Sequence, residues 1–311
     1  MRIQERQLNV AIVTYNSEQY IEALLESLPA AAGQLVLRTV LVDNGSIDAT
    51  VEVAKRFPVD VIETGVNLGY SGGINVARQR LGPGNLAILN PDLTLERASL
   101  EILVAALEGS VGIVAPRVID EEGTLFTHLR REPTVLNAIG ESLFGARFPR
   151  RPAALADTIR EPASYSVPQT VDWAGAPAWV VSSACDQAVG AWDSETYFLY
   201  SEETDYARRA RDAGFTVLYE PAATVVHHGG GSGFSDWQLA LMSRNRIRYF
   251  DRFSRRAASK LAFRVAVVAG HGLRAVSPAH RAAARSIVLG RPVGSRSLPP
   301  WAIKNESGAS R

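Results

Sequence analysis

The order of strand-like and helix-like segments in the first 116 residues constrains the fold of this chain most. Apolar runs of strand length alternate with segments whose apolar residues recur at helical spacing. The strand-like runs are LNVAIVTYN (8–16), LRTVLVDNGS (37–46), VDVIE (59–63), NLAIL (85–89) and VGIVAP (111–116). Because this alternation is typical of a parallel sheet with helices on both faces, the sequence predicts an α/β fold.

The pattern changes after Pro116. Residues 128–170 are rich in Arg and Pro and predict irregular structure with one short helix near 134–144, whereas SDWQLALMSRNRIRYFDRF predicts a long helix at 235–253. We therefore expect three parts, namely an α/β domain over residues 1–253, a basic amphipathic helical extension over 254–290 and a flexible tail over 291–311.

Charge is divided unevenly along a chain whose formal net charge is only +1. Residues 244–311 carry 15 Lys and Arg against two acidic residues, which gives this segment +13 and the rest of the chain −12. Such a segment is suited to bind an anionic partner, for example an anionic membrane or a lipid diphosphate. The alternative is that its charged residues only form the solvated face of a helix. Nucleic-acid binding is disfavoured because no recognised motif accompanies the charge.

Composition and cysteine usage favour a globular cytoplasmic enzyme. The single cysteine, Cys185, cannot form an internal disulfide and is expected to be a small buried hydrophobe in a reducing compartment. The N-terminus has no apolar signal-peptide core. The stretch VAVVAGHGL near the C-terminus is shorter than the roughly 20 residues that span a bilayer. We therefore expect a cytoplasmic protein with at most a peripheral contact to the inner face of the plasma membrane.

Ligands of an open α/β sheet bind at the carboxyl ends of its strands, so the residues that end the strands are informative. The first strand ends in TYNS, without the G-x-G-x-x-G of a dinucleotide-binding fold, which disfavours a nicotinamide or flavin enzyme. The second ends in Asp43, followed by Asn-Gly-Ser. That carboxylate can accept a hydrogen bond from a nucleobase or a ribose, although the same residues also make simple turns.

Two further segments are suited to a diphosphate. NLGYSGGINVAR (67–78) places glycines and small polar residues before a helix, where backbone N–H groups can approach an anion. AILNPD (87–92) leads from a buried strand into Asn90, Pro91 and Asp92, and this carboxylate is well placed to bind a hard divalent cation. An Asx turn is the alternative for Asp92.

The segment YFLYSEETDYARRARDAGF (197–215) concentrates carboxylates at the start of a helical run, at Glu202, Glu203 and Asp205. Acidic residues in a first helical turn complement the helix dipole, and Ser201 is a suitable N-cap. The local sequence therefore predicts a helix start and leaves open whether one of the three carboxylates is catalytic.

In their order, these motifs resemble the family 2 glycosyltransferases of the GT-A fold, in particular the rhamnosyltransferase-like branch. The resemblance covers residues 8–250 and rests on the succession VTYN, VDNGS-D, N-LG-S-G-N, LNPD, W-GA, FLY-EE-D---R and VVHH-GGGS. It implies a nucleotide-diphospho-sugar transferase fold, in which a mostly parallel central sheet is flanked by helices and followed by a C-terminal helical extension.

The resemblance also implies which residues bind the nucleotide-sugar donor and the metal. The implied donor-binding residues are Thr14, Asn16 and Asp43 for the nucleoside and Asn67, Ser71, Asn75 and Asn90 for the sugar diphosphate. Asn90 and Asp92 occupy the first and last positions of the family's Asp-x-Asp metal motif, which leaves one carboxylate here. His227 matches the family's metal-proximal histidine, so Asp92 and His227 are the expected ligands of Mg²⁺ or Mn²⁺.

The remaining implied roles concern the acceptor and the base. Trp173, Gly175 and Ala176 resemble the family's acceptor platform, with core packing as the alternative for Trp173. Where the family has Glu-Asp with Asp as general base, this chain reads Glu202-Glu203, so Glu203 stands at the base position with one extra methylene. Glu202 would shape the site, and Asp205 would cap the helix or support the acceptor side.

These residues favour a metal-dependent, inverting hexosyltransferase. The leading expectation is transfer of L-rhamnose from dTDP-rhamnose to a glycan or a polyprenyl-diphosphate-linked saccharide during cell-surface polysaccharide and cell-wall assembly. UDP-linked and GDP-linked sugars fit the same pattern. The alternative is a sugar-nucleotide-binding module with weak or no catalysis, favoured by the single carboxylate at Asp92 and by Glu at position 203.

Overall fold

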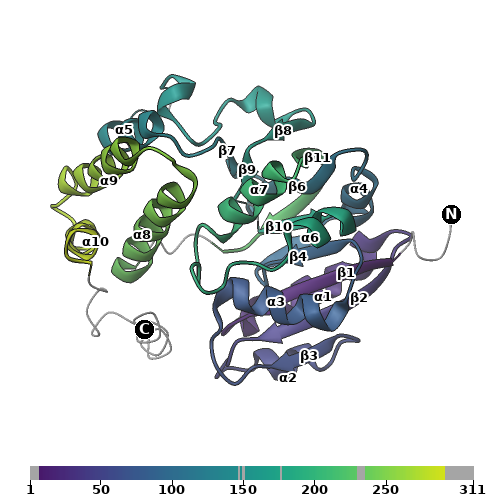
Figure 1. Ribbon diagram of the computed structural model, residues 1–311. Helices are drawn as coiled ribbons and strands as arrows, with labels where there is room; N and C mark the ends of the chain where they lie inside the picture. The colour runs from purple at the N-terminus through teal and green to yellow at the C-terminus, as the bar shows by residue number, and fades with distance from the viewer. Residues whose placement is uncertain (1–6, 146–147, 149–150, 176, 230–234, 291–311) are drawn as a thin grey trace. The chain divides into compact units, whose positions relative to one another are not determined.

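The computed structural model describes residues 7–145, 148, 151–175, 177–229 and 235–290 (Figure 1). The chain divides into two compact units, each described here by itself. The first unit comprises Met1–Arg130, Glu161–Phe198 and Glu202–Gly231, and the second comprises Arg131–Arg160, Leu199–Ser201 and Ser232–Arg311. The predicted boundary at residue 253 stays a prediction, and the predicted tail at 291–311 lies outside the described residues.

The first unit is built on a sheet whose strand order is β3-β2-β1-β4-β10-β6-β11-β5, with β8 paired to β11. The strands are β1 (Gln7–Thr14), β2 (Val36–Asp43), β3 (Asp60–Glu63), β4 (Leu86–Leu89), β5 (Leu93–Leu95), β6 (Val111–Ile119), β8 (Gln169–Val171), β10 (Ala178–Val181) and β11 (Thr216–His227). The predicted α/β architecture with flanking helices is confirmed. The sheet is mostly parallel, as predicted, and three strands run in the opposite direction: β10 lies antiparallel between β4 and β6, and both β5 and β8 run antiparallel to β11.

Helices cover the sheet on both faces. They are α1 (Glu18–Ala32), α2 (Thr50–Ala54), α3 (Gly69–Leu81), α4 (Ser99–Ala105), α6 (Ser183–Val189) and α7 (Glu202–Asp212), together with the short η3 (Pro162–Tyr165). Leu8, Val10 and Ile12 of β1 join one core with residues of α1, α2 and α4. Because side chains alternate along a strand, Val13 points to the opposite face, where α3 packs. Cys185 is buried, as predicted.

Gly73 allows α3 to lie close to β1. A Cβ atom at this position would lie 2.6 Å from Cγ1 of Val13, and Val13 is only 6% exposed, so its side chain has little room to move. Val13 directly precedes Thr14, at the carboxyl end of β1. The small residues of NLGYSGGIN therefore serve helix packing as well as the loop before the helix.

Replacing Gly73 with alanine should destabilise the first unit. Overpacking of a buried contact costs about 1–3 kcal/mol, which exceeds the ~1 kcal/mol that alanine gains over glycine in a helix. Gly272, a helical glycine at which an added Cβ atom would meet nothing within 4 Å, provides the matched control, and Gly272→Ala should be neutral or stabilising. Urea denaturation of both variants tests this, and a Gly73→Ala protein as stable as Gly272→Ala would contradict the tight α3–β1 contact.

The second unit is helical over the described residues. Its elements are α5 (Val135–Phe144), η2 (Ala153–Leu155), α8 (Asp236–Phe253), α9 (Ala257–Gly272) and α10 (Pro278–Leu289). The helices predicted near 134–144 and at 235–253 are thereby confirmed as α5 and α8. A small core joins Ala138 of α5, Ile247 of α8 and Phe263, Ala266 and Val267 of α9. No helix of the described residues is both long enough and apolar enough to cross a membrane.

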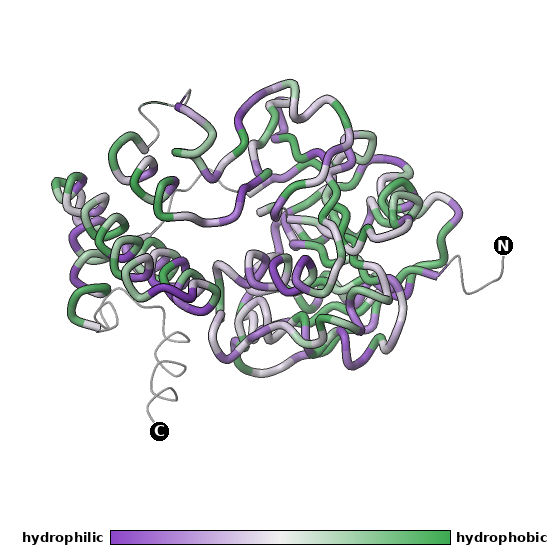
Figure 2. The backbone as a smooth tube through the Cα atoms, turned by 45° about the horizontal axis from the view of Figure 1, so that its top comes forward, coloured by the Kyte–Doolittle hydropathy of each residue, from purple (hydrophilic) through white to green (hydrophobic). Residues whose placement is uncertain are grey.

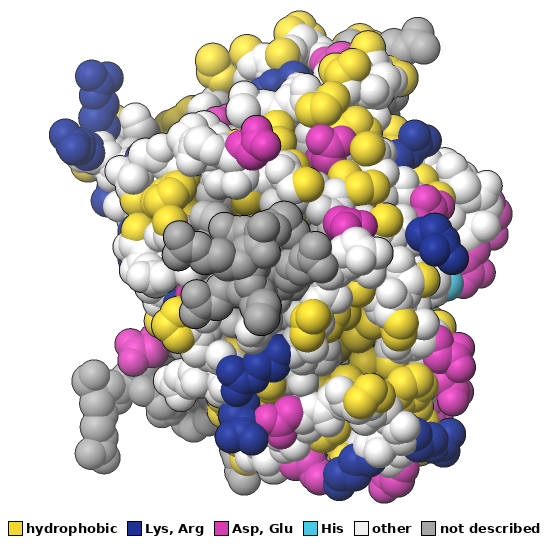
Figure 3. Space-filling model, turned by 90° about the vertical axis from the view of Figure 1, so that its right-hand side faces the viewer, with side chains coloured by type: hydrophobic (Ala, Val, Ile, Leu, Met, Phe, Trp, Pro, Cys, Tyr) yellow, Lys and Arg dark blue, Asp and Glu magenta, His cyan; other side chains and the backbone are white. Residues whose placement is uncertain are grey.

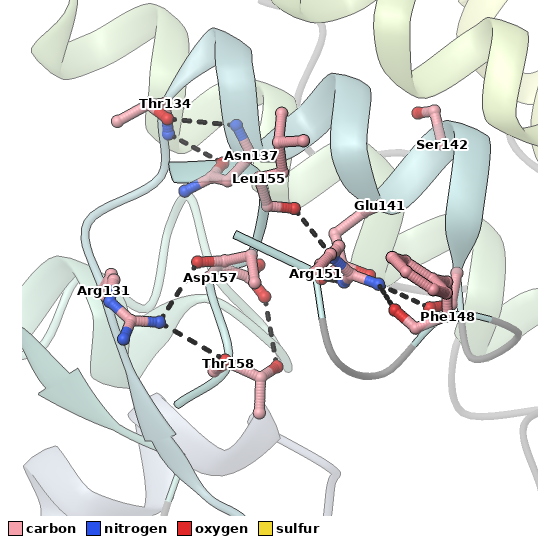
Figure 4. Close-up of polar contacts among 12 residues, drawn as sticks. Arg131, Thr134, Asn137, Glu141, Ser142, Phe148, Arg151, Leu155, Asp157 and Thr158 are labelled. Atoms are coloured by element: carbon pink, nitrogen blue, oxygen red, sulfur yellow. Dashed lines mark hydrogen bonds and ion pairs between the residues drawn. The ribbon is translucent and has the colours of Figure 1, made fainter. Parts of the chain in front are cut away.

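A buried arginine anchors the irregular segment that follows α5 (Figure 4). The Arg151 guanidinium donates hydrogen bonds to the carbonyl oxygens of Gly145 at 2.6 Å and Leu155 at 2.8 Å, and it forms an ion pair with Glu141. At the other end of α5, Thr134 and Asn137 form a reciprocal capping box. In this Arg-rich segment, a guanidinium thus supplies hydrogen bonds to backbone carbonyl oxygens that are not paired within a regular helix or strand.

Candidate active site

The loops after β1 and β2 are joined by hydrogen bonds. The Asp43 carboxylate is 2% exposed and accepts hydrogen bonds from Oγ1 of Thr14 at 3.0 Å, from the Gly45 N–H at 3.1 Å and from the Ser46 N–H at 2.8 Å. Asn16 accepts a hydrogen bond from the Ile47 N–H at 2.9 Å. The three residues expected to hold a nucleoside therefore lie together, and Asp43 and Thr14 shape the turn that a nucleoside would contact.

The beginning of α3 contributes further polar atoms. Oδ1 of Asn67 accepts a hydrogen bond from the Gly69 N–H at 2.8 Å. Gly69 has a φ of 74°, and a Cβ atom there would collide with the carbonyl oxygen of Phe198. Ser71 is fully buried, and its Oγ has no hydrogen-bond partner among the described residues. Ser71 therefore has a hydroxyl in the first turn of α3 that no described residue engages, within the segment expected to bind the donor.

Asn75 and Asn90 connect backbone segments. The Asn75 amide donates to the Trp192 carbonyl oxygen at 2.8 Å and accepts from the Trp192 N–H at 2.9 Å. Both ends of this side chain are therefore engaged with the backbone, and its expected contact with the donor stays a prediction. The Asn90 N–H donates to the Pro177 carbonyl oxygen at 2.8 Å, which ties the end of β4 to the residue before β10.

Asp92 and His227 meet because β5 and β11 pair antiparallel, with His227 opposite Leu93. Nε2 of His227 lies 3.0 Å from Oδ2 of Asp92. The next residue, His228, points elsewhere: its ring lies 2.7 Å from Oγ1 of Thr94 and 2.6 Å from Oε1 of Glu121. The alternation of side chains along a strand explains why only the first of the two histidines meets Asp92.

The Asp92–His227 pair has features that fit a divalent cation. Oδ1 of Asp92 is buried without a hydrogen-bond partner among the described residues. A Cβ atom at Gly229 would overlap Oδ2 of Asp92 and lie 3.3 Å from Nε2 of His227, so glycine leaves space beside both potential ligand atoms. No cluster of three or more His, Cys, Asp or Glu able to hold a metal occurs in the described part of the chain. A metal held here would therefore need further oxygen ligands, such as those of a diphosphate.

Glu203 lies in the first turn of α7 and is half-buried. Burial raises the pKa of its carboxyl to about 7, while its own backbone N–H and the Arg130 guanidinium act in the opposite direction. A carboxyl group with a pKa near 7 is suited to accept a proton at neutral pH. The candidate base therefore has the titration behaviour that this role requires.

The two neighbouring acidic residues, Glu202 and Asp205, are more deeply buried than Glu203. Glu202 is 3% exposed and Asp205 is fully buried. Nε of Arg209 donates a hydrogen bond to Oδ2 of Asp205 at 2.7 Å within α7. This ion pair indicates that Asp205 stabilises the helix. The backbone before the helix is left-handed, with φ of 69° at Tyr200 and 71° at Ser201, so Ser201 lacks the extended backbone typical of an N-cap.

Trp173 and Arg130 lie opposite each other in a small two-stranded sheet beside α7. Strands β7 (Leu129–Arg130) and β9 (Trp173–Ala174) pair antiparallel, with Arg130 opposite Trp173. The Arg130 guanidinium lies 5.9 Å from the centre of the Trp173 ring, within the range of a cation–π interaction. Gly175 donates its N–H to the His128 carbonyl oxygen at 2.9 Å, and Ala176 lies outside the described residues.

Tyr70 and Arg130 were not singled out by the sequence. Burial raises the pKa of the Tyr70 phenol well above its ordinary value, and the carboxylates of Glu203, Glu202 and Asp92 raise it further, in that order. The phenol is therefore within electrostatic range of both the candidate base and the candidate metal ligand. Tyr70 lies inside NLGYSGGIN, a motif notable for its glycines and amides, and no local pattern indicates where its phenol points.

Comparison with known proteins shows which family part of this chain is similar to. Residues 9–159 match the family described as glycosyl transferase family 2. The chain is 29% identical over 257 residues to the N-acetylglucosaminyl-diphospho-decaprenol L-rhamnosyltransferase of Mycobacterium tuberculosis, covering 78% of this chain and 82% of that protein. It is 24% identical to the low-salt glycan biosynthesis hexosyltransferase Agl10 of Haloferax volcanii, covering 71% of this chain and 67% of that protein.

Solved structures show the same fold. The mannosyltransferase PcManGT from Pyrobaculum calidifontis, in complex with GDP-Man and Mn²⁺, matches with a TM-score of 0.54 and 15% identity over 98% of this chain and 79% of that one. GalNAc-T7 with UDP, GalNAc and Mn²⁺ matches with a TM-score of 0.57 and 14% identity over 79% of this chain, which spans 47% of the GalNAc-T7 chain. The expected GT-A fold is thereby confirmed.

Proposed function

We propose that this chain belongs to glycosyl transferase family 2, to which residues 9–159 are similar, and that it transfers a hexose from a nucleotide diphosphate to a glycan or a polyprenyl-diphosphate-linked saccharide. L-Rhamnose from dTDP-rhamnose is the leading donor, and the similarity to an L-rhamnosyltransferase that acts on a diphospho-decaprenol supports both the sugar and the lipid-linked acceptor. Such a reaction belongs to cell-surface polysaccharide or cell-wall assembly, at the cytoplasmic side of the membrane.

One observation carries the proposal. The negative charges of Glu203 and Asp92 both raise the pKa of the Tyr70 phenol, so the carboxylate suited to be the base and the carboxylate suited to a cation are both within electrostatic range of one side chain. Displacement at a sugar carbon needs these two functions near each other, one on the acceptor side and one on the diphosphate side.

The catalytic roles follow from this arrangement. Glu203 takes the proton from the attacking hydroxyl of the acceptor, and Arg130 favours the charged form of Glu203 in which it can do so. Trp173 offers an aromatic face on which a sugar ring can stack. A single displacement inverts the anomeric centre, whereas retention would need a nucleophile beneath the sugar, for which the family resemblance offers no candidate.

Asp92 and His227 are the proposed metal ligands. A Mg²⁺ or Mn²⁺ ion bound by them would neutralise the negative charge that develops on the leaving diphosphate. Oδ1 of Asp92 is buried and has no hydrogen-bond partner in the described part of the chain, and this atom and the space left by Gly229 support the assignment. Thr14, Asn16, Asn67 and Ser71 are the proposed contacts of the nucleoside and sugar.

A binding module without catalysis is the second candidate. The single carboxylate in Asn90-Pro91-Asp92 favours it, because the metal site then has fewer charged protein ligands. Such a module would bind a sugar nucleotide without releasing the nucleoside diphosphate.

A donor screen separates the two candidates. Purified protein is incubated with dTDP-rhamnose, UDP-N-acetylglucosamine, UDP-galactose or GDP-mannose, with and without Mn²⁺, in the presence of an N-acetylglucosaminyl-diphospho-lipid. We expect acceptor-dependent release of dTDP and a product heavier by one deoxyhexose. Binding of a donor without release of any nucleotide across the panel would favour the binding module.

A further inference from the structure

His128 is a fully buried polar residue of the first unit, enclosed by aromatic rings. The ring centres of Tyr165 and Tyr219 lie 5.9 and 5.8 Å from that of His128, at interplanar angles of 61° and 66°. Tyr219 belongs to β11 of the large sheet, and its hydroxyl donates a hydrogen bond to the Tyr165 carbonyl oxygen at 3.2 Å. Figure 2 shows many hydrophobic segments, in green, among the strands of this unit. A histidine in such surroundings calls for a reason, because burial of a polar group is unfavourable unless it is hydrogen-bonded.

Hydrogen bonding defines which nitrogen of the His128 ring carries the proton. Nδ1 lies 2.9 Å from the Phe126 carbonyl oxygen, which can only accept, so the proton is on Nδ1. Nε2 is buried and has no hydrogen-bond partner among the residues that the structure describes. Burial lowers the pKa of the imidazole to about 4, while the Phe126 carbonyl oxygen acts in the opposite direction. The neutral ring is therefore a fixed donor to the backbone two residues earlier.

His128 also joins the large sheet to the small sheet of β7 and β9. Its carbonyl oxygen accepts a hydrogen bond from the Gly175 N–H, directly after β9, at 2.9 Å. The next residue, Leu129, begins β7 and donates its N–H to the Tyr165 hydroxyl at 3.1 Å. The ring of His128 thus packs against the large sheet, while its main chain holds the small one.

The small sheet places Arg130 near the candidate base. Strand β9 lies beside α7 (Figure 1), and Asp172, directly before β9, forms an ion pair with Arg211 of α7 at 3.5 Å. Arg130 ends β7, two residues after His128. Its guanidinium lowers the pKa of the Glu203 carboxyl against the effect of burial. The position of β7 therefore affects the charge of Glu203.

The charges that act on Glu203 come from groups close to it. Besides Arg130, the Tyr70 phenol of α3 faces this carboxyl, and Glu202 precedes it on α7. Acidic and basic side chains are interspersed over the surface seen in Figure 3, and salt screens exposed charges beyond about 10 Å. A displacement of the Arg130 guanidinium should therefore change the titration of Glu203 directly.

We propose that His128 is a positioning residue, whose Nδ1–H bond to the Phe126 carbonyl oxygen fixes the start of β7 and thereby holds Arg130 near Glu203. The bond links residues 126 and 128, immediately before β7, so its loss frees the chain where the small sheet begins. Arg130 then spends less time near Glu203, and the carboxylate loses part of a stabilising charge. The consequence for transfer rests on the proposed function, whereas the placement of Arg130 does not.

Two amide substitutions test the Nδ1–H bond. The amide nitrogen of His128→Asn is three bonds from Cα, as Nδ1 is, and it can still donate to the Phe126 carbonyl oxygen. The amide nitrogen of His128→Gln is four bonds from Cα, as Nε2 is, and it misses that carbonyl. Both variants place an amide in the same buried space, so they are matched in polarity, and urea denaturation should give them similar stability.

NMR titration of carbon-13-labelled glutamate carboxyls measures the pKa of Glu203 without any turnover, with Glu203→Gln assigning the signal. An opposite charge close to a carboxyl shifts its pKa by about 1–3 units, so partial displacement of Arg130 in His128→Gln should raise the pKa by about 0.5–1 unit. Arg130→Met should raise it at least as much, and His128→Asn should leave it at the wild-type value. In transfer assays, His128→Gln should move the decline of kcat/KM to higher pH, with unchanged donor affinity.

The wild type supplies a measurement that needs no variant to fold. Nitrogen-15 NMR of the His128 ring should show the proton on Nδ1 at neutral pH, and a proton on Nε2 instead would overturn the proposal. Equal titration of Glu203 in the wild type and in His128→Gln, or equal shifts in the Asn and Gln variants, would overturn it as well. A shifted titration in a protein that transfers no sugar would support the positioning role and contradict only the proposed function.

Discussion

Replacing Glu203 with glutamine should lower kcat by about 10²–10⁴-fold, the contribution of a well-placed general base. Glutamine keeps the length and shape of the side chain but cannot accept the proton of the acceptor hydroxyl. Donor affinity should remain near that of the wild type, because the base acts on the acceptor. Steady-state transfer kinetics and calorimetric titration with the donor measure the two effects separately.

The matched control for this substitution is Glu195→Gln, which neutralises an exposed carboxylate of the same unit and should leave kcat unchanged. If Glu203→Gln turned over at nearly the wild-type rate, the base would have to be sought at Glu202, the buried glutamate that precedes it at the start of α7.

The pH dependence of the wild type provides a second test of Glu203. The active form is the deprotonated carboxylate, and its pKa is raised to about 7. The value of kcat/KM should therefore be constant above this pH and fall about tenfold per pH unit below it. Since the Arg130 cation favours the charged carboxylate, Arg130→Met should raise the pKa of Glu203 and move this decline to higher pH.

Replacing Asp92 with alanine should abolish the Mn²⁺-dependent part of donor binding. The substitution removes the carboxylate that faces His227 at 3.0 Å. Loss of a supporting group around a metal ligand already costs about 10–100-fold in metal affinity, so loss of a ligand itself should cost at least that. Calorimetric titration of the nucleoside diphosphate with and without Mn²⁺ measures the effect directly and does not require turnover.

Two adjacent histidines supply the control. His227→Ala should weaken Mn²⁺-dependent binding in the same way, whereas His228→Ala should not, because the His228 ring lies against Thr94 and Glu121. Equal effects of the two histidine substitutions, or unchanged binding in Asp92→Ala, would contradict the metal assignment.

The sequence predicted well those features that arise from local patterns. Strand–helix alternation predicted the flanked sheet, and the polar residues that end β1, β2 and β4 were correctly placed at the ends of buried strands. The short strand β5 was not predicted, since three residues carry too little periodicity. It is nevertheless the strand that sets His227 against Asp92.

Contacts between distant segments could not be predicted from local patterns. Asn75 pairs with the backbone of Trp192, 117 residues away, and an asparagine within a helix gives no indication of such a partner. The position of Arg130 beside Trp173 depends on the pairing of two strands of two residues each. Strand β11 continues through Pro221 with an irregularity between Glu220 and Thr224, although proline is unfavourable inside a strand.

The anomeric configuration of the transferred sugar tests the central claim most directly. Proton NMR of the first product formed from dTDP-rhamnose and an N-acetylglucosaminyl-diphospho-lipid reports this configuration before any equilibration. Direct displacement assisted by Glu203 predicts the configuration opposite to that of the donor. Retention of the donor configuration would contradict the account, since it would require a nucleophile in place of a base.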